Sequence, residues 1–316
     1  LGKAPTGRDP DRYEKMHKHT DVLIVGGGPA GLAAALSAGR TGARVMLVDE
    51  GNAFGGALLG DRDQKIDGAQ ALDWVRATIA ELEAMPDVTM LMRTTATGYY
   101  DHNYLTLLER VTDHLGTAPD HTPRQRLWKI RAKRVVLAAG AIERPLVFAD
   151  NDRPGIMLSS AARTYVNRYG VAPGQRVLIF TNNDDAYRTV LALRDNGVSV
   201  VGIVDLRAEP TGPLVDAARA ASLMIHAGHA VVSTSGTLRV KSVQIMKLTA
   251  DGAAVTGLAR RIECDAVAVS GGWTSTVHLF SQSAGKLKWN EDIAAFVPDI
   301  SVQAEASAGA CNGAMA

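Results

Sequence analysis

Three glycines near the start of the chain have the spacing of a phosphate-binding turn. They follow the apolar run 22–25 and precede a stretch rich in alanine and leucine. In a GxGxxG turn the first glycine permits a tight bend, the second lets the backbone approach a pyrophosphate, and the third lets helix and strand pack closely. The helix N-terminus offers free N–H groups and the positive end of its dipole to the phosphates. The pattern predicts a dinucleotide-binding turn made of Gly26, Gly28, Pro29, Ala30 and Gly31.

Two acids stand where a nucleotide ribose would be bound. The strand predicted over residues 44–48 ends on Asp49 and Glu50. An acid at this position accepts hydrogen bonds from the ribose hydroxyls of an adenosine, and its charge disfavours a 2′-phosphate. Strand, glycines, helix, strand and acid occur in this order within about thirty residues, which makes the motif specific. The unit 21–50 is therefore predicted to be a dinucleotide-binding βαβ.

Two further groups of small residues are candidates for the same site. Gly55 and Gly56 follow the acid closely and can let the backbone pass near a cofactor, with a plain loop as the alternative. The buried strand predicted over residues 135–138 runs into Ala139, Gly140 and Ala141, whose small side chains allow the chain to turn beside a bound dinucleotide.

A second βαβ pattern follows, with a different turn. A strand over 177–180, a helix over 185–196 and a strand over 198–204 ending on Asp205 repeat the first unit. The turn between them reads TNNDD, residues 181–185, in place of glycines. We expect its two carboxylates to cap the helix and to repel a phosphate. This second site is predicted to be degenerate.

These elements define an α/β fold, in which a Rossmann-like FAD/NAD(P)-binding domain carries an inserted second, smaller Rossmann-like domain. The expected divisions are an N-terminal arm over residues 1–19, with a short helix over 11–18, a discontinuous dinucleotide-binding domain over 20–154 and 265–316, and the inserted domain over 155–264. We further expect a helix over 67–85 and a third strand over 88–100. Separate strands are predicted over 104–108 and 127–130.

Composition excludes several classes of protein. The chain has 316 residues and a formal charge of +1, which gives no electrostatic case for binding nucleic acid or an anionic membrane. No apolar run reaches the length of a membrane span, so the default expectation is a cytoplasmic protein. Because the first residue is Leu1 rather than Met and the last residues are rich in glycine, we expect a piece of a longer polypeptide.

The sequence offers no catalytic residue and no metal site. Cys264 and Cys311 are far apart and form no CxxC, so we expect two buried, unreactive thiols. The eight histidines are scattered. His278, beside the predicted strand 265–270, is the histidine to inspect, with a structural role as the expectation.

Longer stretches resemble a known family. GGGPAGLAAA, VVLAAGAIERP and the repeated Rossmann unit resemble flavoproteins with two dinucleotide-binding domains. RPGIMLSSAARTYVNRYGV, TNNDDAYRTVLALRDNGV and SGGWTSTVHLFSQSAGKLKW look like the α subunit of heterotetrameric sarcosine oxidase. The similarity runs from about residue 20 to residue 316, and the chain would be the central part of that longer subunit.

The resemblance implies a cofactor and partners. The first Rossmann site would hold NAD+, which takes no part in turnover, whereas relatives hold FAD or another nucleotide there. Asp49 would bind the ribose, with Glu50 as the alternative; Ala96 would lie near the adenine, and Ala139 to Ala141 near the dinucleotide. The complete enzyme would contain β, γ and δ subunits, an FAD, and an FMN at the α/β boundary. It would oxidise sarcosine with O2 and pass the one-carbon unit to tetrahydrofolate through a C-terminal domain absent from this chain.

Two departures from the wider flavoprotein pattern bear on this assignment. The second turn lacks glycines, and Gly309-Ala310 stands where flavoproteins carry a Gly-Asp pair. Both argue against a self-contained reductase, and the second weakens the case for FAD at the first site. The alternatives are a free-standing FAD-dependent NAD(P)H reductase and a structural subunit with an empty Rossmann site.

Overall fold

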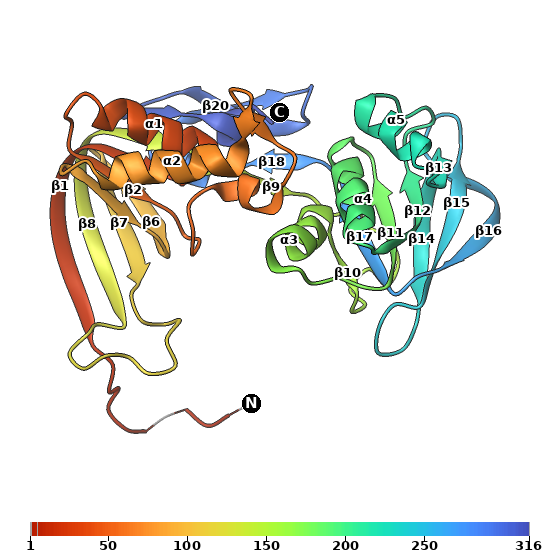
Figure 1. The fold of residues 1–316 in the computed structure, drawn as a ribbon, viewed down its shortest axis with the longest axis horizontal. Coiled ribbons are helices and arrows are strands. Elements are labelled where there is room, and N and C mark those ends of the chain that lie inside the picture. Colours follow the sequence, from red (N-terminus) through yellow and green to blue (C-terminus); the bar gives the residue numbers. More distant parts are fainter. Residues whose placement is uncertain (1, 5, 316) are drawn as a thin grey trace. The chain divides into compact units, whose positions relative to one another are not determined.

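The structure is a computed structural model that describes residues 2–4 and 6–315. The chain forms two compact units (Figure 1). The first comprises Leu1–Gly56, Lys65–Ala141 and Ser275–Ala316, and the second comprises Ala57–Gln64 and Ile142–Thr274. No helix among the described residues is long and apolar enough to cross a membrane.

The first unit is built on one mixed sheet with the strand order β5-β2-β1-β8-β7-β6, and β21 adds to β8. The neighbours β1, β2, β5, β8 and β21 run parallel, whereas β6 and β7 are antiparallel. The strands are β1 (Tyr13–Val25), β2 (Val45–Val48), β5 (Val88–Leu91), β6 (Thr94–Tyr100), β7 (Tyr104–Arg110), β8 (Gln125–Leu137) and β21 (Glu305–Ser307).

Two helices of this unit, α1 (Pro29–Gly39) and α2 (Ala71–Glu83), lie side by side next to the parallel strands (Figure 1). Helix α1 begins without a side-chain cap: Gly28 is the extended N-cap residue and Pro29 fixes the first helical φ. The smaller elements are β3 (Lys65–Ile66), β4 (Ala69–Gln70), α6 (His278–Gln282), β19 (Lys286–Asn290), β20 (Ala295–Ile300) and the 3-10 turn η2 (Gly309–Asn312). A second 3-10 turn, η1 (Gly56–Gly60), starts at the last residue of the unit's first segment.

The predicted N-terminal arm is wrong for residues 13–19, and so is the helix over 11–18. These residues form the first half of β1, which pairs with β8 from Tyr13, opposite Gln125, to Val25, opposite Leu137. The pairing supplies partners for the backbone groups of this polar segment, and such ladder bonds outweigh a weak helical pattern. The strands predicted over 127–130 and 135–138 are likewise parts of one long strand, β8.

The strand predicted over 88–100 is two strands. Arg93 has a φ of 52°, a left-handed conformation that breaks the strand between β5 and β6. Only β5 is the third parallel strand of the Rossmann sheet, because it pairs with β2. Ala96 therefore lies in the antiparallel β6, opposite Leu107, rather than in that third strand.

The second unit has a parallel sheet with the order β10-β17-β11-β12-β13. Its helices cover one face, and the antiparallel sheet β14-β15-β16 lies on the other side of the strands (Figure 1). The strands are β10 (Ile156–Leu158), β11 (Arg176–Thr181), β12 (Ser199–Asp205), β13 (Ile225–Ala227), β14 (His229–Ser235), β15 (Ser242–Leu248), β16 (Val255–Glu263) and β17 (Ala266–Ser270). The helices are α3 (Ser159–Tyr169), α4 (Asp185–Asp195) and α5 (Pro213–Ala220).

The second unit extends beyond the predicted limits of 155 and 264. It begins at Ile142 because Phe148 and the residues around it pack into a core with β17. It ends at Thr274, so β17 belongs to it rather than to the first unit. The segment 57–64 also joins it: the Gly60 carbonyl accepts a hydrogen bond from the Asn167 side chain at 3.0 Å. The limits at Ile142 and Thr274 fall within two short paired strands, β9 (Ala141–Glu143) and β18 (Trp273–Ser275).

Candidate dinucleotide site

Two of the three motif glycines are required by packing. Gly26 has a φ of 106°, and a Cβ there would lie 2.2 Å from the carbonyl oxygen of Ala138 at the end of β8. A Cβ on Gly31 would lie 1.8 Å from the carbonyl oxygen of Gly26. A side chain at residue 26 would push the turn away from the end of β8, and one at residue 31 would push α1 away from β1. These glycines therefore set the shape of the turn.

Gly28 differs because the space in front of it is open. A Cβ there would meet only the Cα of Gly56, at 3.8 Å. Gly56 has a φ of 56°, and its own Cβ would lie 2.8 Å from the Cα of Gly28. The neighbouring Gly55 donates its N–H to the carbonyl of Gly27 at 2.7 Å. The structure thus brings the Gly55-Gly56 pair directly beside the glycine turn, leaving a backbone-lined cradle at Gly28.

Pro29 and Ala30 form the first turn of α1, whose N–H groups lack intrahelical acceptors. The turn η2 lies against this end of the helix, since a Cβ on Gly309 would be 2.8 Å from the Cβ of Ala30. The carbonyl of Ala310 accepts the hydroxyl of the buried Ser275 at 2.8 Å. Gly309 therefore lies at the N-terminus of α1.

The Asp49 carboxylate faces the glycine turn. Its Oδ2 accepts the N–H of Gly27 at 2.6 Å, and its Oδ1 accepts the N–H of Gly51 at 2.7 Å. A carboxylate has about four acceptor positions, so two remain for ribose hydroxyls. Glu50 points elsewhere. It lines a surface cavity of about 220 Å³ with Asn52, Arg93, Arg110, Asp113 and His114.

Of the other predicted site residues, Ala139 lies beside the turn, Gly140 and Ala141 follow it in the chain, and Ala96 is partly buried against the hydrophobic core. Ala138 donates its N–H to the carbonyl of Val25 at 2.8 Å, which places the start of this segment next to Gly26. Gly140 has a φ of 72°, and its carbonyl accepts the N–H of Thr276 at 3.0 Å. Ala96 packs on the first unit's hydrophobic core. Phe54 was not predicted from the sequence. Its buried ring packs against the glycine turn, since a Cβ on Gly27 would lie 2.3 Å from its Cδ1.

The residues present fit a dinucleotide. The first unit offers a glycine cradle free of side chains at Gly28, a helix N-terminus, and an acid with unused acceptor positions. His278 is an exposed residue at the start of α6, and both cysteines are buried. Burial raises the pKa of the Cys264 thiol to about 12 and also raises that of Cys311. The described residues contain no cluster of side chains suited to a metal ion.

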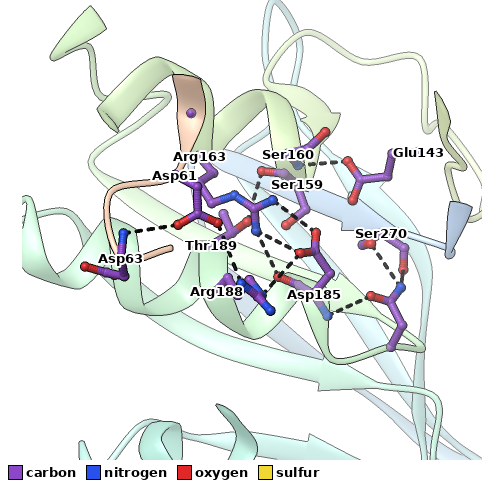
Figure 2. Close-up of polar contacts among 12 residues, drawn as sticks. Asp61, Asp63, Glu143, Ser159, Ser160, Arg163, Asp185, Arg188, Thr189 and Ser270 are labelled. Carbon is purple, nitrogen blue, oxygen red and sulfur yellow. Dashed lines mark hydrogen bonds and ion pairs between the residues drawn. The ribbon is translucent and has the colours of Figure 1, made fainter. Parts of the chain in front are cut away.

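The second unit carries a cluster of charges at the carboxyl end of its sheet (Figure 2). Arg163, only 8% exposed, binds the Asp185 carboxylate through both of its terminal nitrogens, at 3.1 and 3.3 Å. Arg188 lies 3.7 Å from the same carboxylate and 3.8 Å from that of Asp61. The prediction that the acids of the TNNDD turn cap α4 is wrong. The side-chain oxygen of Asn183 accepts the N–H of Asp185, at 3.1 Å, and the carboxylates pair with arginines.

Glu143 is the buried acid of this region, 3% exposed. It accepts the N–H of Ser160 at 2.8 Å and so caps α3, whose N-cap residue Leu158 has no polar side chain (Figure 2). Burial raises the pKa of the Glu143 carboxyl, and hydrogen bonds from Ser160 and Ser270 oppose that rise. The sequence shows an acid after the predicted strand but not its burial, so this role was not predicted.

Comparison with known proteins agrees with this geometry. Residues 21–114 match the family of FAD dependent oxidoreductases. The chain is 45% identical, over 99% of its length, to the sarcosine oxidase subunit alpha of Corynebacterium sp. (strain P-1), of which it covers 32%. It is 46% identical, over 94% of its length, to that of Rhizobium meliloti (strain 1021), of which it covers 29%. The chain is a homologue of sarcosine oxidase α subunits. It spans about a third of the length of these relatives.

The fold is shared more widely. The L-proline dehydrogenase from P. horikoshii superposes with a TM-score of 0.69 at 23% identity, covering 94% of this chain and 52% of the dehydrogenase. The predicted fold class is confirmed: the chain is an α/β protein of the Rossmann type found in FAD/NAD(P)-binding flavoproteins. At this level of identity the likeness carries the fold and not the reaction.

Proposed function

We propose that the chain is the nucleotide-binding core of a sarcosine oxidase-type α subunit and that its first Rossmann site holds NAD+. The observation that carries this proposal is the complete cradle of the first unit, with open space at Gly28 and an acid facing it, in a chain 43–46% identical to such subunits. The turn from Gly26 to Gly31 would hold the pyrophosphate, and Asp49 the adenosine ribose. The segment from Ala139 to Ala141 would lie beside the dinucleotide, with Ala96 toward the adenine.

In this proposal the chain works as one part of a larger oxidase. The relatives are named as subunits, which supports a complex of several chains. That complex would oxidise the C–N bond of sarcosine, with O2 as acceptor and H2O2 as product. Its β, γ and δ subunits, its FAD and its tetrahydrofolate site would lie outside this chain, and its FMN would lie at the boundary between the α and β subunits. The chain's own residues would bind and orient the nucleotide, and we assign none of them a catalytic role.

A second candidate is FAD at the first site of a free-standing NAD(P)H reductase. The match of residues 21–114 to FAD dependent oxidoreductases supports FAD there. Ala310, whose methyl group stands in place of the acid of a Gly-Asp pair, and the arginine-paired acids of the second turn favour NAD+ and a subunit role.

One experiment separates these candidates. The purified protein is examined by absorption spectroscopy, then denatured, and the released nucleotide is identified by chromatography. Released NAD+ without flavin absorbance supports the proposed function. A yellow protein that releases FAD and bleaches with NADH establishes the reductase instead. Protein that releases no nucleotide and binds none on titration leaves the structural subunit.

A further inference from the structure

The two Rossmann units of the chain can be aligned residue by residue. VLIVGGGPAG (22–31) and VLIFTNNDDA (177–186) each form the first strand and turn, and β2 and β12 are the second strands. Val48-Asp49 aligns with Val204-Asp205, because each acid ends its strand and accepts the N–H of the residue two positions later. Asp205 is thus the counterpart of Asp49.

The residue two positions after each acid is where the units differ. In the first unit it is Gly51, which has no side chain. In the second unit it is Arg207, whose side chain turns back onto the acid. Its Nε donates to Asp205 Oδ1 at 3.1 Å and one terminal nitrogen donates to Oδ2 at 2.8 Å. The other terminal nitrogen donates to Asp184 Oδ1 at 2.7 Å.

Arg207 therefore bridges the two places where a dinucleotide would be held. Asp184 precedes α4 and aligns with Pro29, so it lies at the helix end that binds phosphate in such units. Asp205 aligns with the acid that binds the ribose. A guanidinium that contacts both carboxylates lies along the path from ribose to pyrophosphate.

The hydrogen bonds accepted by Asp205 and Asp49 also indicate that Arg207 occupies the second site. Asp205 is fully buried and accepts four hydrogen bonds: from the Arg207 N–H, from its Nε and terminal nitrogen, and from the Tyr187 hydroxyl at 2.9 Å. Four bonds use about all the acceptor positions of a carboxylate. Asp49 accepts two such bonds and is partly exposed. A ribose hydroxyl could bind Asp205 only by displacing Arg207, which is partly exposed, from a carboxylate that is fully buried, and this would leave a buried charge without its partner.

We propose that Arg207 is a built-in occupant of the second Rossmann site and closes it to adenine dinucleotides. The hydrogen-bond donors of its guanidinium take the place of the ribose hydroxyls at Asp205 and also hold the Asp184 carboxylate at the start of α4, where its charge repels a phosphate. The second unit then keeps the Rossmann fold but does not bind a dinucleotide, because Arg207 occupies its site. The chain binds one dinucleotide, in the first unit. This inference rests on the proposed function only for the identity of that nucleotide.

The test uses the chain with its first site disabled by Gly28→Val, so that any remaining binding reports the second unit. Titration calorimetry with NAD+ measures affinity, and hydrogen exchange of residues 181–187 and 205–207 reports where it binds. With Arg207 intact we expect no saturable binding and no protection of these segments. Adding Arg207→Gly with Asn183→Gly, which copies the first unit at these two positions, should give saturable binding at least tenfold above the parent, with protection at both segments.

Two results would overturn the proposal. One is protection of 181–187 by NAD+ while Arg207 is intact, abolished by Asp205→Asn. The other is a folded Arg207→Gly/Asn183→Gly variant that gains no binding. If the glycine variant does not fold, Arg207→Gln replaces Arg207→Gly. Glutamine keeps much of the side-chain volume but cannot bridge both acids, so this variant must show the same increase in NAD+ binding. If the wild-type protein does not bind NAD+ at its first site, that result counts against the proposed function. The results for the Arg207 variants can still be interpreted, because they report on the second unit.

Discussion

The carboxylate of Asp49 lies 2.6 Å from the backbone nitrogen of Gly27 and accepts its hydrogen. The residue proposed to bind the ribose thus also fastens the glycine turn to the end of β2. The same carboxylate holds the N–H of Gly51. One side chain therefore couples the position of the turn to that of the loop after the acid, before any nucleotide is bound.

Asp49→Asn should weaken nucleotide binding by about 10- to 100-fold, the range expected for losing hydrogen bonds to a charged group. The amide has one acceptor atom where the carboxylate has two, so it can satisfy Gly27 or Gly51 but not both. Titration calorimetry with NAD+ measures the loss, and thermal unfolding should show a lower Tm. Glu50→Gln is the matched control, because Glu50 lines a different cavity. Equal losses in both variants would contradict the assignment of Asp49.

Gly28→Ala and Gly31→Ala should separate binding from folding. A methyl group at residue 28 meets only Gly56, at 3.8 Å, so the fold should keep its stability while nucleotide binding falls at least tenfold. A methyl group at residue 31 would lie 1.8 Å from the Gly26 carbonyl, so helix and strand must move apart. Overpacking of this kind costs about 1–3 kcal/mol. Urea unfolding and NAD+ titration of both variants check the contrast, and a Gly28→Ala variant that binds like wild type would disprove the cradle.

Glu143→Gln should change the dependence of stability on pH. Burial raises the folded-state pKa of Glu143 above its ordinary value of 4.5. A carboxyl with a raised pKa favours folding below the unfolded pKa, and this contribution is lost as pH rises through the folded pKa. Glutamine still accepts the Ser160 N–H but does not ionise. The variant should therefore gain stability relative to wild type as pH increases.

The measurement is the free energy of unfolding by urea at pH 4.5 and at pH 8 for both proteins. Ser160→Ala is the companion variant: it keeps the titrating group and the backbone N–H but removes a hydroxyl that opposes the rise of the Glu143 pKa, so it should retain and strengthen the pH dependence of wild type. A difference between Glu143→Gln and wild type that stays constant with pH would show that Glu143 is not a destabilised buried carboxylate.

Much of the first unit could be predicted from the sequence because local rules and the fold agree there. The glycine spacing and the acid at residue 49 each have one geometric use in a Rossmann turn, and the structure gives them that geometry. The segment 13–19 could not be predicted, because its strand depends on pairing with residues 125–131, more than a hundred positions away. A polar, weakly patterned stretch leaves such pairing invisible.

The second site could be predicted only in part, for a related reason. Missing glycines at 181–185 indicate a degenerate turn, but which groups its acids contact depends on side chains from other elements. Arg163 comes from α3, and Arg207 follows β12. Position 207, two residues after the acid, was the available signal, since its counterpart is Gly51. Capping rules alone favoured Asp184 and Asp185 over Asn183 as the caps of α4. In the structure the arginines bind these carboxylates, and Asn183 accepts the backbone hydrogen bond instead.

The ion pair of Arg163 with Asp185 should stabilise the second unit far more than an exposed pair does. Arg163 is 8% exposed and the Asp185 side chain is 25% exposed, so removing Arg163 would leave a partly buried charge, which we expect to cost about 1–3 kcal/mol. We expect Arg163→Met to destabilise the protein by about that amount, reduced to the extent that Arg188 takes over the carboxylate. Arg163→Met/Asp185→Leu should cost less than the sum of the single changes, because it leaves no unpaired charge.

The pair Arg219–Asp216 is the control: its side chains are 49% and 68% exposed, and breaking it should cost at most about 1 kcal/mol. Urea unfolding of all variants measures the coupling. Single changes at Arg163 that cost no more than those at Arg219 would show that the buried cluster does not hold α3 against α4.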